Sequence, residues 1–184
     1  TSKFYIIGVG GFRAGIGVTS IALLIAEFLR TYTNTKVLLL ERSGNDDFSS
    51  IKINHNSKIH MIGKEGIVEP AYYKSSGYSF CVIDYGLNWK TQEYHFLQCD
   101  LKIFIGGRAI WQQKDWQIIK SWLKEKEINN KSFRFLMNLY DNPKRLLKNE
   151  LSVNIYGIGY ESDLFQPSLK TVNILKEVLF CCIV

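Results

Sequence analysis

Six runs of apolar and β-branched residues recur along the chain, and each is short enough to form one strand. Apolar residues follow one another within these runs with little alternation, which is typical of strands covered on both faces of a sheet. A weaker seventh run spans residues 59–62. The pattern therefore predicts a sheet of about seven strands. The stronger runs are Phe4 to Val9, Val37 to Leu40, Phe80 to Ile83, Leu101 to Ile105, Phe133 to Leu139 and Val153 to Ile158.

Helical periodicity fills several of the gaps between these runs. Residues 21–29, 111–123 and 172–179 each place apolar side chains at the three- and four-residue spacing of one helix face. Because strands and helices alternate through most of the chain, we expect an α/β fold with a doubly wound, mostly parallel sheet and helices on both faces. One such domain accounts for residues 1–184. Ligands of such sheets bind beyond the carboxyl ends of the strands.

A glycine-rich stretch from Val9 to Ser20 connects the first strand to the first helix. Its glycines let the backbone approach a ligand closely, and the first amides of the following helix carry a partial positive charge. The stretch therefore predicts a phosphate-binding loop. However, Val18 stands where the pattern G-x-x-x-x-G-K-[ST] requires a lysine. Two interpretations stay open: a loop that binds an anion through its backbone, and a vestigial tight turn.

Composition narrows the class of protein but not its partner. With 184 residues, 46% hydrophobic and 22% charged, the chain can bury one sizeable core. No run approaches the roughly 18 to 20 apolar residues of a membrane span, and the start enters a strand instead of a signal peptide, so we expect a cytoplasmic protein. A first residue other than methionine is compatible with a domain excised from a longer chain. The net charge of +6 fits transient contact with an anionic membrane or nucleic acid.

Cysteine, histidine and tryptophan residues give weaker signals. The cysteines at 81, 99, 181 and 182 form no C-x-x-C pair, and we expect reduced thiols, mostly in the core. The three histidines have no metal-ligand spacing. Core packing is favoured for the tryptophans of the second helix, but Trp116 falls off its main apolar face, which indicates an exposed position at a partner surface.

The order of these pieces resembles the MinD/ParA superfamily of deviant P-loop ATPases over nearly the whole chain. Residues 13–20 fall on the family's loop, which reads K-G-G-x-G-K-[ST]-[ST]. The remaining pieces are similar to the family's first helix at 21–29, its strand ending in an acid at 36–41, the strand of the switch aspartate at 78–86, the strand whose asparagine faces adenine at 137–141, and the late loop at 156–168.

The resemblance implies a site for ATP or ADP with Mg²⁺, whereas the residues alone also fit a chain without a cofactor. Thr19 and Asp84 would hold the Mg²⁺ ion, and Arg13 and Asp84 are the candidates for a catalytic role. Without the resemblance, Thr19 and Asp84 are equally a helix-end hydroxyl and a strand-end carboxylate bonded to backbone. The implied nucleotide contacts are Gly11, Arg13, Gly15, Ile16, Gly17, Val18, Thr19, Ser20, Glu41, Asn138 and Tyr160.

Two of these contacts have a second interpretation in the sequence. Glu41 ends its strand, where an acid could hold a ribose or position water, but where it could also be simply solvated. Asn138 could face adenine through its amide or be a structural amide with satisfied hydrogen bonds. The irregular segment 42–79 is likewise either a nucleotide-facing region or a surface connection.

Departures from the family pattern shape the expected function. Val18 replaces the lysine that would neutralise the phosphates, and a neutral side chain cannot stabilise the charge of a transferring phosphoryl group. Arg13 replaces the signature lysine, which in this family reaches toward the partner's nucleotide in a dimer. Ser43 stands near the place of a second acid, with Asp46 and Asp47 close by. Within the superfamily, a chain that keeps the loop but lacks its lysine most resembles the CpaE/TadZ branch. These are localisation proteins of pilus and secretion assembly.

This resemblance implies a degenerate nucleotide-binding domain with weak or no ATPase activity, which acts as a localisation or assembly scaffold. A homodimer, an unidentified protein partner and a peripheral position at the inner face of the membrane are expected with it. One alternative is a short-chain-dehydrogenase-like oxidoreductase that uses NAD(P), because Gly11-x-x-x-Gly15-Ile16-Gly17 matches that loop and Tyr140 to Lys144 reads Y-x-x-x-K, although Pro143 disfavours the helix this pair needs. A second alternative is a DNA-associated partition protein, which the charge permits.

Overall fold

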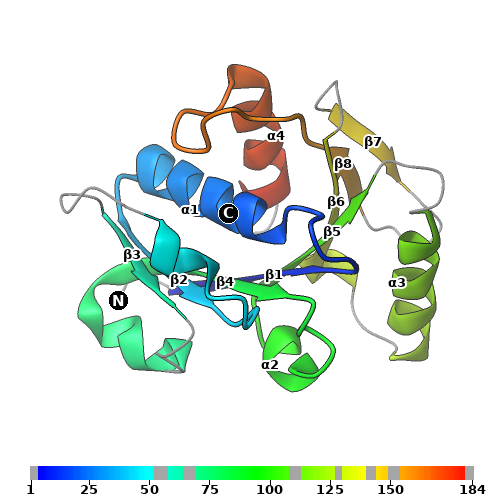
Figure 1. The fold of residues 1–184 in the computed structure, drawn as a ribbon, viewed down its shortest axis with the longest axis horizontal. Helices are drawn as coiled ribbons and strands as arrows, with labels where there is room; N and C mark the ends of the chain where they lie inside the picture. Colours follow the sequence, from blue (N-terminus) through cyan, green and yellow to red (C-terminus); the bar gives the residue numbers. More distant parts are fainter. Residues whose placement is uncertain are drawn as a thin grey trace.

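Strands that are buried on both faces form the centre of the computed structural model, which describes residues 4–51, 58–63, 69–107, 113–126, 130–139, 144–148 and 154–180. The eight strands of its sheet lie in the order β3-β2-β4-β1-β5-β6-β8-β7 (Figure 1). Seven are parallel, and β7 runs antiparallel to β8. The strands are β1 (Tyr5–Gly11), β2 (Lys36–Glu41), β3 (Ile59–Ile62), β4 (Tyr78–Gly86), β5 (Leu101–Gly107), β6 (Phe133–Asn138), β7 (Lys144–Lys148) and β8 (Asn154–Gly157).

The predicted α/β class and its seven apolar runs are confirmed as the seven parallel strands. The apolar pattern does not predict β7, because the residues of this strand, KRLLK, are mostly basic. Such charges are common on a strand at the edge of a sheet, where they discourage pairing with another chain. An apolar pattern therefore finds the centre of this sheet and overlooks its margin.

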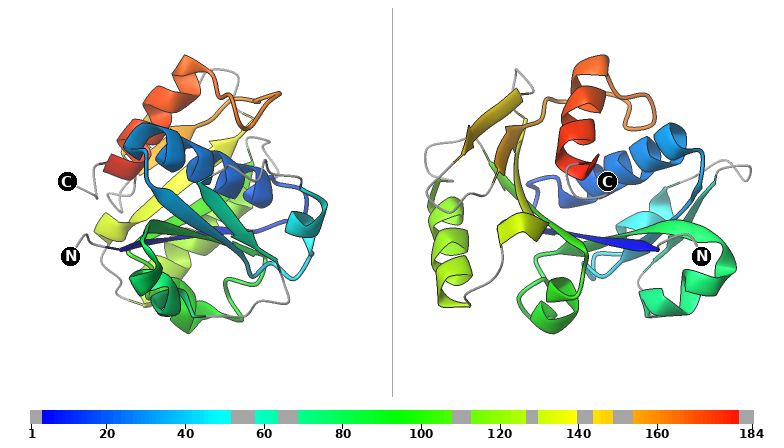
Figure 2. Two further views of the ribbon diagram at one scale, coloured as in Figure 1. Left: turned by 90° about the vertical axis from the view of Figure 1, so that its left-hand side faces the viewer. Right: turned by 180° about the vertical axis from the view of Figure 1, so that it is seen from behind.

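Helices cover both faces of the sheet, as predicted. Helices α1 (Val18–Thr33) and α4 (Leu169–Phe180) lie on one face, and α2 (Glu93–Leu97) and α3 (Gln113–Glu125) lie on the other (Figures 1 and 2). The short α2 escaped prediction because five residues offer too little periodicity. Three 3₁₀ turns complete the described elements: η1 (Asp47–Ser50), η2 (Pro70–Ser76) and η4 (Asn130–Ser132).

Alternate residues of each central strand enter two separate cores. In β2, Val37 and Leu39 join the core beneath α1 and α4, whereas Leu38 and Leu40 join the core beneath α2 and α3. The second core is rich in aromatic rings, with Trp89 at its centre. Because both faces are covered, the strands read as near-continuous apolar runs.

The structure corrects the prediction for Trp116. This side chain is half-buried and packs against Phe135 of β6, with ring centroids 5.1 Å apart. Its surroundings are the α3 side of the sheet, not an open partner surface. Cys81 and Cys99 are buried free thiols, and Cys181 and Cys182 lie outside the described residues. Among the described helices, none is both long and apolar enough to cross a membrane.

Strand order removes the structural basis of the oxidoreductase alternative. Strand β4 lies between β1 and β2, whereas the dinucleotide-binding order 3-2-1-4-5-6 places the first two strands side by side. Lys144 opens strand β7, so it cannot share a helical face with a tyrosine four residues earlier. Residues 140–143 themselves lie outside the described residues.

Candidate functional site

The glycine loop runs from the carboxyl end of β1 at Gly11 to the start of α1 at Val18. Gly15 and Gly17 have positive φ angles of 72° and 93°, a region that other residues adopt at a cost. A Cβ atom on Gly17 would also lie 2.2 Å from the Asn138 side-chain nitrogen. The first intrahelical bond runs from the Ile21 amide to the Gly17 carbonyl at 3.0 Å. The predicted loop therefore has the backbone form that presents a helix N-terminus to an anion.

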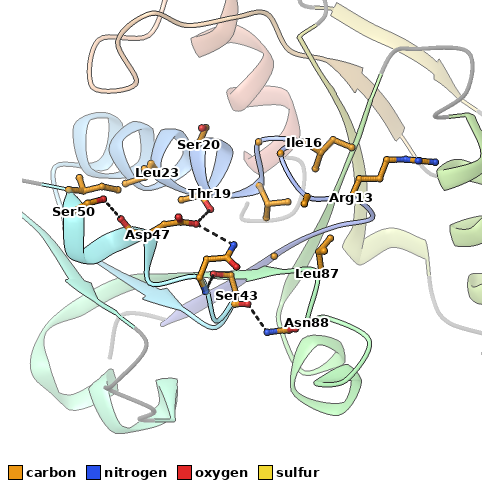
Figure 3. Close-up of a pocket in the computed structure, with 17 residues that line it drawn as sticks. Arg13, Ile16, Thr19, Ser20, Leu23, Ser43, Asp47, Ser50, Leu87 and Asn88 are labelled. Carbon is orange, nitrogen blue, oxygen red and sulfur yellow. Dashed lines mark hydrogen bonds between the residues drawn. The ribbon is translucent and has the colours of Figure 1, made fainter.

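A cleft of about 690 Å³ opens at this loop, within the usual size range of small-molecule sites. Three segments enclose it, and they follow the carboxyl ends of β1, β2 and β4, where ligands of such sheets bind (Figure 3). Its described lining residues are Arg13, Ala14, Gly15, Ile16, Gly17, Val18, Thr19, Ser20, Leu23, Ser43, Asn45, Asp47, Ser50, Ile51, Gly86, Leu87 and Asn88.

Val18 is an apolar part of both the cleft and the core. Its side chain is only 7% exposed and belongs to the cluster beneath α1 and α4. A Cβ atom on Gly11 would lie 2.5 Å from the Val18 Cγ2 atom, so valine occupies the space directly above that glycine. The position of the family lysine thus holds a packed hydrocarbon and supplies no charge to the cleft.

Arg13 at the tip of the loop is bound within its own chain. Its Nε and Nη2 atoms each donate to the Asp115 carboxylate at 2.9 Å, which forms a bidentate ion pair. Hydrogen bonding to Asp115 raises the pKa of Arg13. Figure 3 shows Arg13 extending away from Thr19, toward α3. The Asp115 side chain is 2% exposed, so the pair joins the loop to the first turn of α3.

Thr19 links the loop to two carboxylates from other segments. Its hydroxyl Oγ1 lies 2.7 Å from Asp84 Oδ2 and 3.2 Å from Asp47 Oδ2. Asp84 is fully buried in β4, and its Oδ1 atom accepts a hydrogen bond from the Gly86 amide at 2.8 Å. The structure therefore brings together the predicted pair Thr19 and Asp84, and it adds Asp47 of η1 to them.

Burial raises the pKa of Asp84 from 3.8 to about 6. Hydrogen bonds from Thr19 and Gly86 partly oppose this rise, while the nearby carboxylates of Glu41 and Asp47 add to it. The site thus concentrates negative charge next to a helix N-terminus. Asp84 is not among the described lining residues of the cleft, but it is hydrogen-bonded to Thr19, which is. A carboxylate with a perturbed pKa beside a cleft is typical of functional sites.

Glu41 is not a solvated strand end, which corrects that interpretation, and it is not among the described lining residues of the cleft. Its side chain is buried, and the carboxylate accepts hydrogen bonds from the Asp47 amide at 2.9 Å and the Phe48 amide at 3.0 Å. The Ser43 hydroxyl donates to the same carboxylate at 2.9 Å. Glu41 therefore fixes the turn that carries Asp47.

Asn138 and Tyr160 also lie apart from the described cleft lining. The Asn138 amide donates to the Ile16 carbonyl at 2.9 Å, and its oxygen accepts from the Leu139 amide. It therefore acts here as a structural amide behind the loop. Tyr160 precedes α4 with a 76% exposed side chain. The predicted contacts from Arg13 to Ser20 line the cleft, whereas Gly11, Asn138 and Tyr160 are not among its described lining residues.

Three residues that organise the site were not predicted from the sequence as such. Trp89 donates from its indole nitrogen to the Gly11 carbonyl at 2.8 Å, which anchors the start of the loop. Asp115 and Asp47 bind Arg13 and Thr19 across separations of 102 and 28 residues. One feature of the sequence did point to Asp47: it is an acidic residue shortly after a strand that itself ends in an acidic residue, Glu41. Asp115 and Trp89 stand in helical or loop patterns that indicate only packing.

Comparison with known proteins identifies the fold. A plasmid partition protein from Borrelia burgdorferi B31 bound to AMPPNP matches with a TM-score of 0.65 and 16% identity, over 97% of this chain and 99% of that chain. A ParA family ATPase from Chlorobium tepidum TLS matches with a TM-score of 0.63 and 14% identity, over 97% and 93%. A chain of the MinC:MinD cell division complex of Aquifex aeolicus matches with a TM-score of 0.55 and 12% identity, over 74% and 69%.

Neither a family model nor a curated relative matches this sequence. These three neighbours are a plasmid partition protein, a ParA family ATPase and a chain of a cell division complex, and this chain has their α/β P-loop NTPase fold. At 12–16% identity the likeness establishes the fold and no more. The chemistry of the cleft depends on its own residues.

Proposed function

We propose that this chain is a degenerate ParA/MinD-like nucleotide-binding domain with weak or no ATPase activity, which acts as a localisation or assembly scaffold. The observation that carries the proposal is Val18. The loop keeps the backbone form that receives phosphate, but a packed valine stands at the position of the catalytic lysine. Binding uses mainly backbone amides and the helix end, whereas phosphoryl transfer also needs a cation near the developing charge.

The donor set near Thr19 fits a magnesium ion. A hydroxyl and carboxylate oxygens are the hard ligands that Mg²⁺ prefers, and Mg²⁺ usually keeps several waters and binds substrate phosphates as well. Across the ranges that the structure describes, no group of three or more histidine, cysteine, aspartate or glutamate side chains forms a metal cage. Thr19, with Asp84 and Asp47 beside it, would hold the ion. Bound Mg²⁺ would neutralise phosphate charge in place of the missing lysine.

A scaffold role rests on surfaces outside the cleft. Large apolar or aromatic side chains are more than 70% exposed at four described positions on different segments, and such side chains are enriched at protein interfaces. A neighbour of the same fold was solved in the MinC:MinD complex. We propose a homodimer and an unidentified protein partner on this basis, as in the CpaE/TadZ-like branch. The four residues are Tyr72, Tyr94, Tyr160 and Leu169.

Arg13 limits how such a dimer could form. Its guanidinium is held by Asp115 of the same chain, so contact with a partner's nucleotide would require it to leave a bidentate ion pair. Peripheral attachment to a membrane and association with DNA remain predictions from the net charge of +6. The cleft itself supports nucleotide binding more directly than either of these.

The first test is nucleotide binding set against turnover. We expect ATP and ADP, each with Mg²⁺, to raise the melting temperature, because a ligand that binds only the folded state stabilises it. We expect steady-state ATP turnover far below about 1 per second, the lower end of ordinary enzyme rates. Turnover at or above that rate would contradict the pseudo-ATPase assignment. Lack of stabilisation by either nucleotide at millimolar concentration would contradict nucleotide binding.

Restoring the lysine should strengthen ATP binding. In Val18→Lys the methylene stem can follow the path of the valine, and the ammonium group can extend into the cleft that this residue lines. A charge-assisted hydrogen bond contributes about 1.5–3 kcal/mol, so we expect about 10- to 100-fold tighter ATP binding by calorimetry. Val18→Met is the matched control, because it lengthens the side chain without a charge. Equal affinities of the two variants would show that position 18 does not face the phosphates.

A further inference from the structure

The balance of charge in the cleft is unusual for a phosphate site. Asp84 and Asp47 both lie within hydrogen-bonding distance of one hydroxyl, that of Thr19 at the second position of α1. Glu41 lies directly behind them and bonds the backbone of η1. Among these three acids, only Asp47 is a described lining residue of the cleft, and Asp84 is fully buried beside it. A nucleotide phosphate brought to this helix N-terminus would therefore meet the Asp47 carboxylate as well as amides.

The basic side chains that could neutralise this negative charge are either paired with another residue or absent from the loop. Arg13 is the only basic residue among the described lining residues, and Asp115 holds its guanidinium on the side of α3. Val18 occupies the lysine position with a hydrocarbon. Backbone dipoles remain, but they amount to about half a charge at a helix end. They cannot balance several phosphate charges together with the Asp47 carboxylate in the cleft.

Hydrogen bonds hold the backbone of Asp47 in this arrangement. Its amide donates to Glu41, and its carbonyl accepts from the Ser50 hydroxyl at 2.8 Å. These bonds fix both sides of the residue at the start of η1. Figure 3 shows its carboxylate directed at Thr19, into the cleft. The carboxylate oxygen Oδ2 lies 3.2 Å from the Thr19 hydroxyl and accepts from the Asn45 side-chain amide at 3.4 Å, so the Asp47 side chain faces the cleft from a backbone that η1 holds in place.

We propose that this site takes a nucleotide only as its complex with a divalent cation, and that Asp47 is the residue that makes the cation obligatory. The inference rests on the nucleotide-binding function proposed above. In lysine-bearing loops a protein cation offsets part of the phosphate charge before any metal arrives. Here Thr19 and Asp47 would hold a metal ion, which would supply the positive charge that the loop lacks. The chain should consequently bind nucleotide only when the divalent cation is present.

Calorimetric titration of ADP with Mg²⁺ and with EDTA tests the proposal. For the unmodified chain we expect EDTA to weaken ADP binding by about 100-fold or more, because like charges a few ångströms apart repel strongly in a partly buried site. In Asp47→Asn we expect ADP to bind about tenfold more tightly in EDTA than the unmodified chain does. The difference in ADP affinity between Mg²⁺ and EDTA should therefore be smaller in Asp47→Asn than in the unmodified chain.

Asp46→Asn is the matched control. Asp46 is exposed and has a φ angle of 61°, which asparagine adopts as readily as aspartate, so the change removes the same charge one residue away. It should leave both affinities unchanged. Equal ADP affinity with and without Mg²⁺ would overturn this inference and leave nucleotide binding standing. Identical behaviour of the two variants would overturn the role of Asp47, and absence of ADP binding even with Mg²⁺ would overturn the proposed function itself.

Discussion

Replacing Trp89 with alanine is expected to lower the free energy of unfolding by about 3–5 kcal/mol, the usual cost of removing a large buried aromatic side chain. Trp89 is 1% exposed, and its ring contacts Phe96, Phe104 and Trp122 with centroids 4.9–5.9 Å apart. The substitution also removes the donor to the Gly11 carbonyl. Chemical denaturation with urea measures the change through the shift of the midpoint at constant slope.

Two further variants separate packing from the hydrogen bond. Trp89→Phe keeps a ring in the core but removes the indole donor, so it should cost less than alanine while still loosening the start of the loop. Trp116→Ala removes the same ring from a half-buried position that contacts Phe135, and it should be clearly milder. A Trp89→Ala cost no greater than that of Trp116→Ala would contradict the central place of Trp89 in this core.

The fold could be predicted from the sequence because its strands are buried on both faces. Continuous apolar runs such as Val37 to Leu40 indicate strands covered on both faces, and the helical periods between them indicate the alternation of strands and helices. Elements without that signal were missed. Strand β7 pairs by backbone bonds at an edge, and α2 spans only Glu93 to Leu97. Their formation depends on neighbours that are distant in the chain.

The site was predictable in its backbone and unpredictable in its side chains. Glycines before a helix indicate the loop, because positive φ angles and close approach leave few other residues possible. The partner of Arg13 is Asp115, and nothing in the sequence distinguishes this aspartate from an exposed one on the first turn of a helix. Glu41 shows the reverse case. Its position at a strand end resembles a ligand contact, but tertiary structure turns its carboxylate onto the backbone of η1.

Replacing Asp84 with asparagine is expected to stabilise the folded chain near neutral pH. The folded-state pKa of about 6 exceeds the ordinary 3.8, so folding favours the protonated acid. The contribution of Asp84 to stability is therefore greatest below about pH 4 and is lost as the pH rises toward 6 and beyond. A shift of about two units corresponds to about 3 kcal/mol at most. In Asp84→Asn the amide oxygen can still accept from Gly86, and the amide nitrogen can donate to Thr19.

Denaturation between pH 4 and pH 8 measures this effect, with Asp163→Asn as the control. Asp163 also accepts a hydrogen bond from the amide two residues later, at 2.8 Å, but it is exposed, so its replacement should change little. Asp84→Asn should gain stability only above about pH 5, and a loss of stability at pH 7 would identify Asp84 as a structural residue. A gain would mean that the native carboxylate costs the fold free energy. A binding site can retain such a destabilising carboxylate because bound Mg²⁺ would compensate its buried negative charge, which the folded chain alone does not.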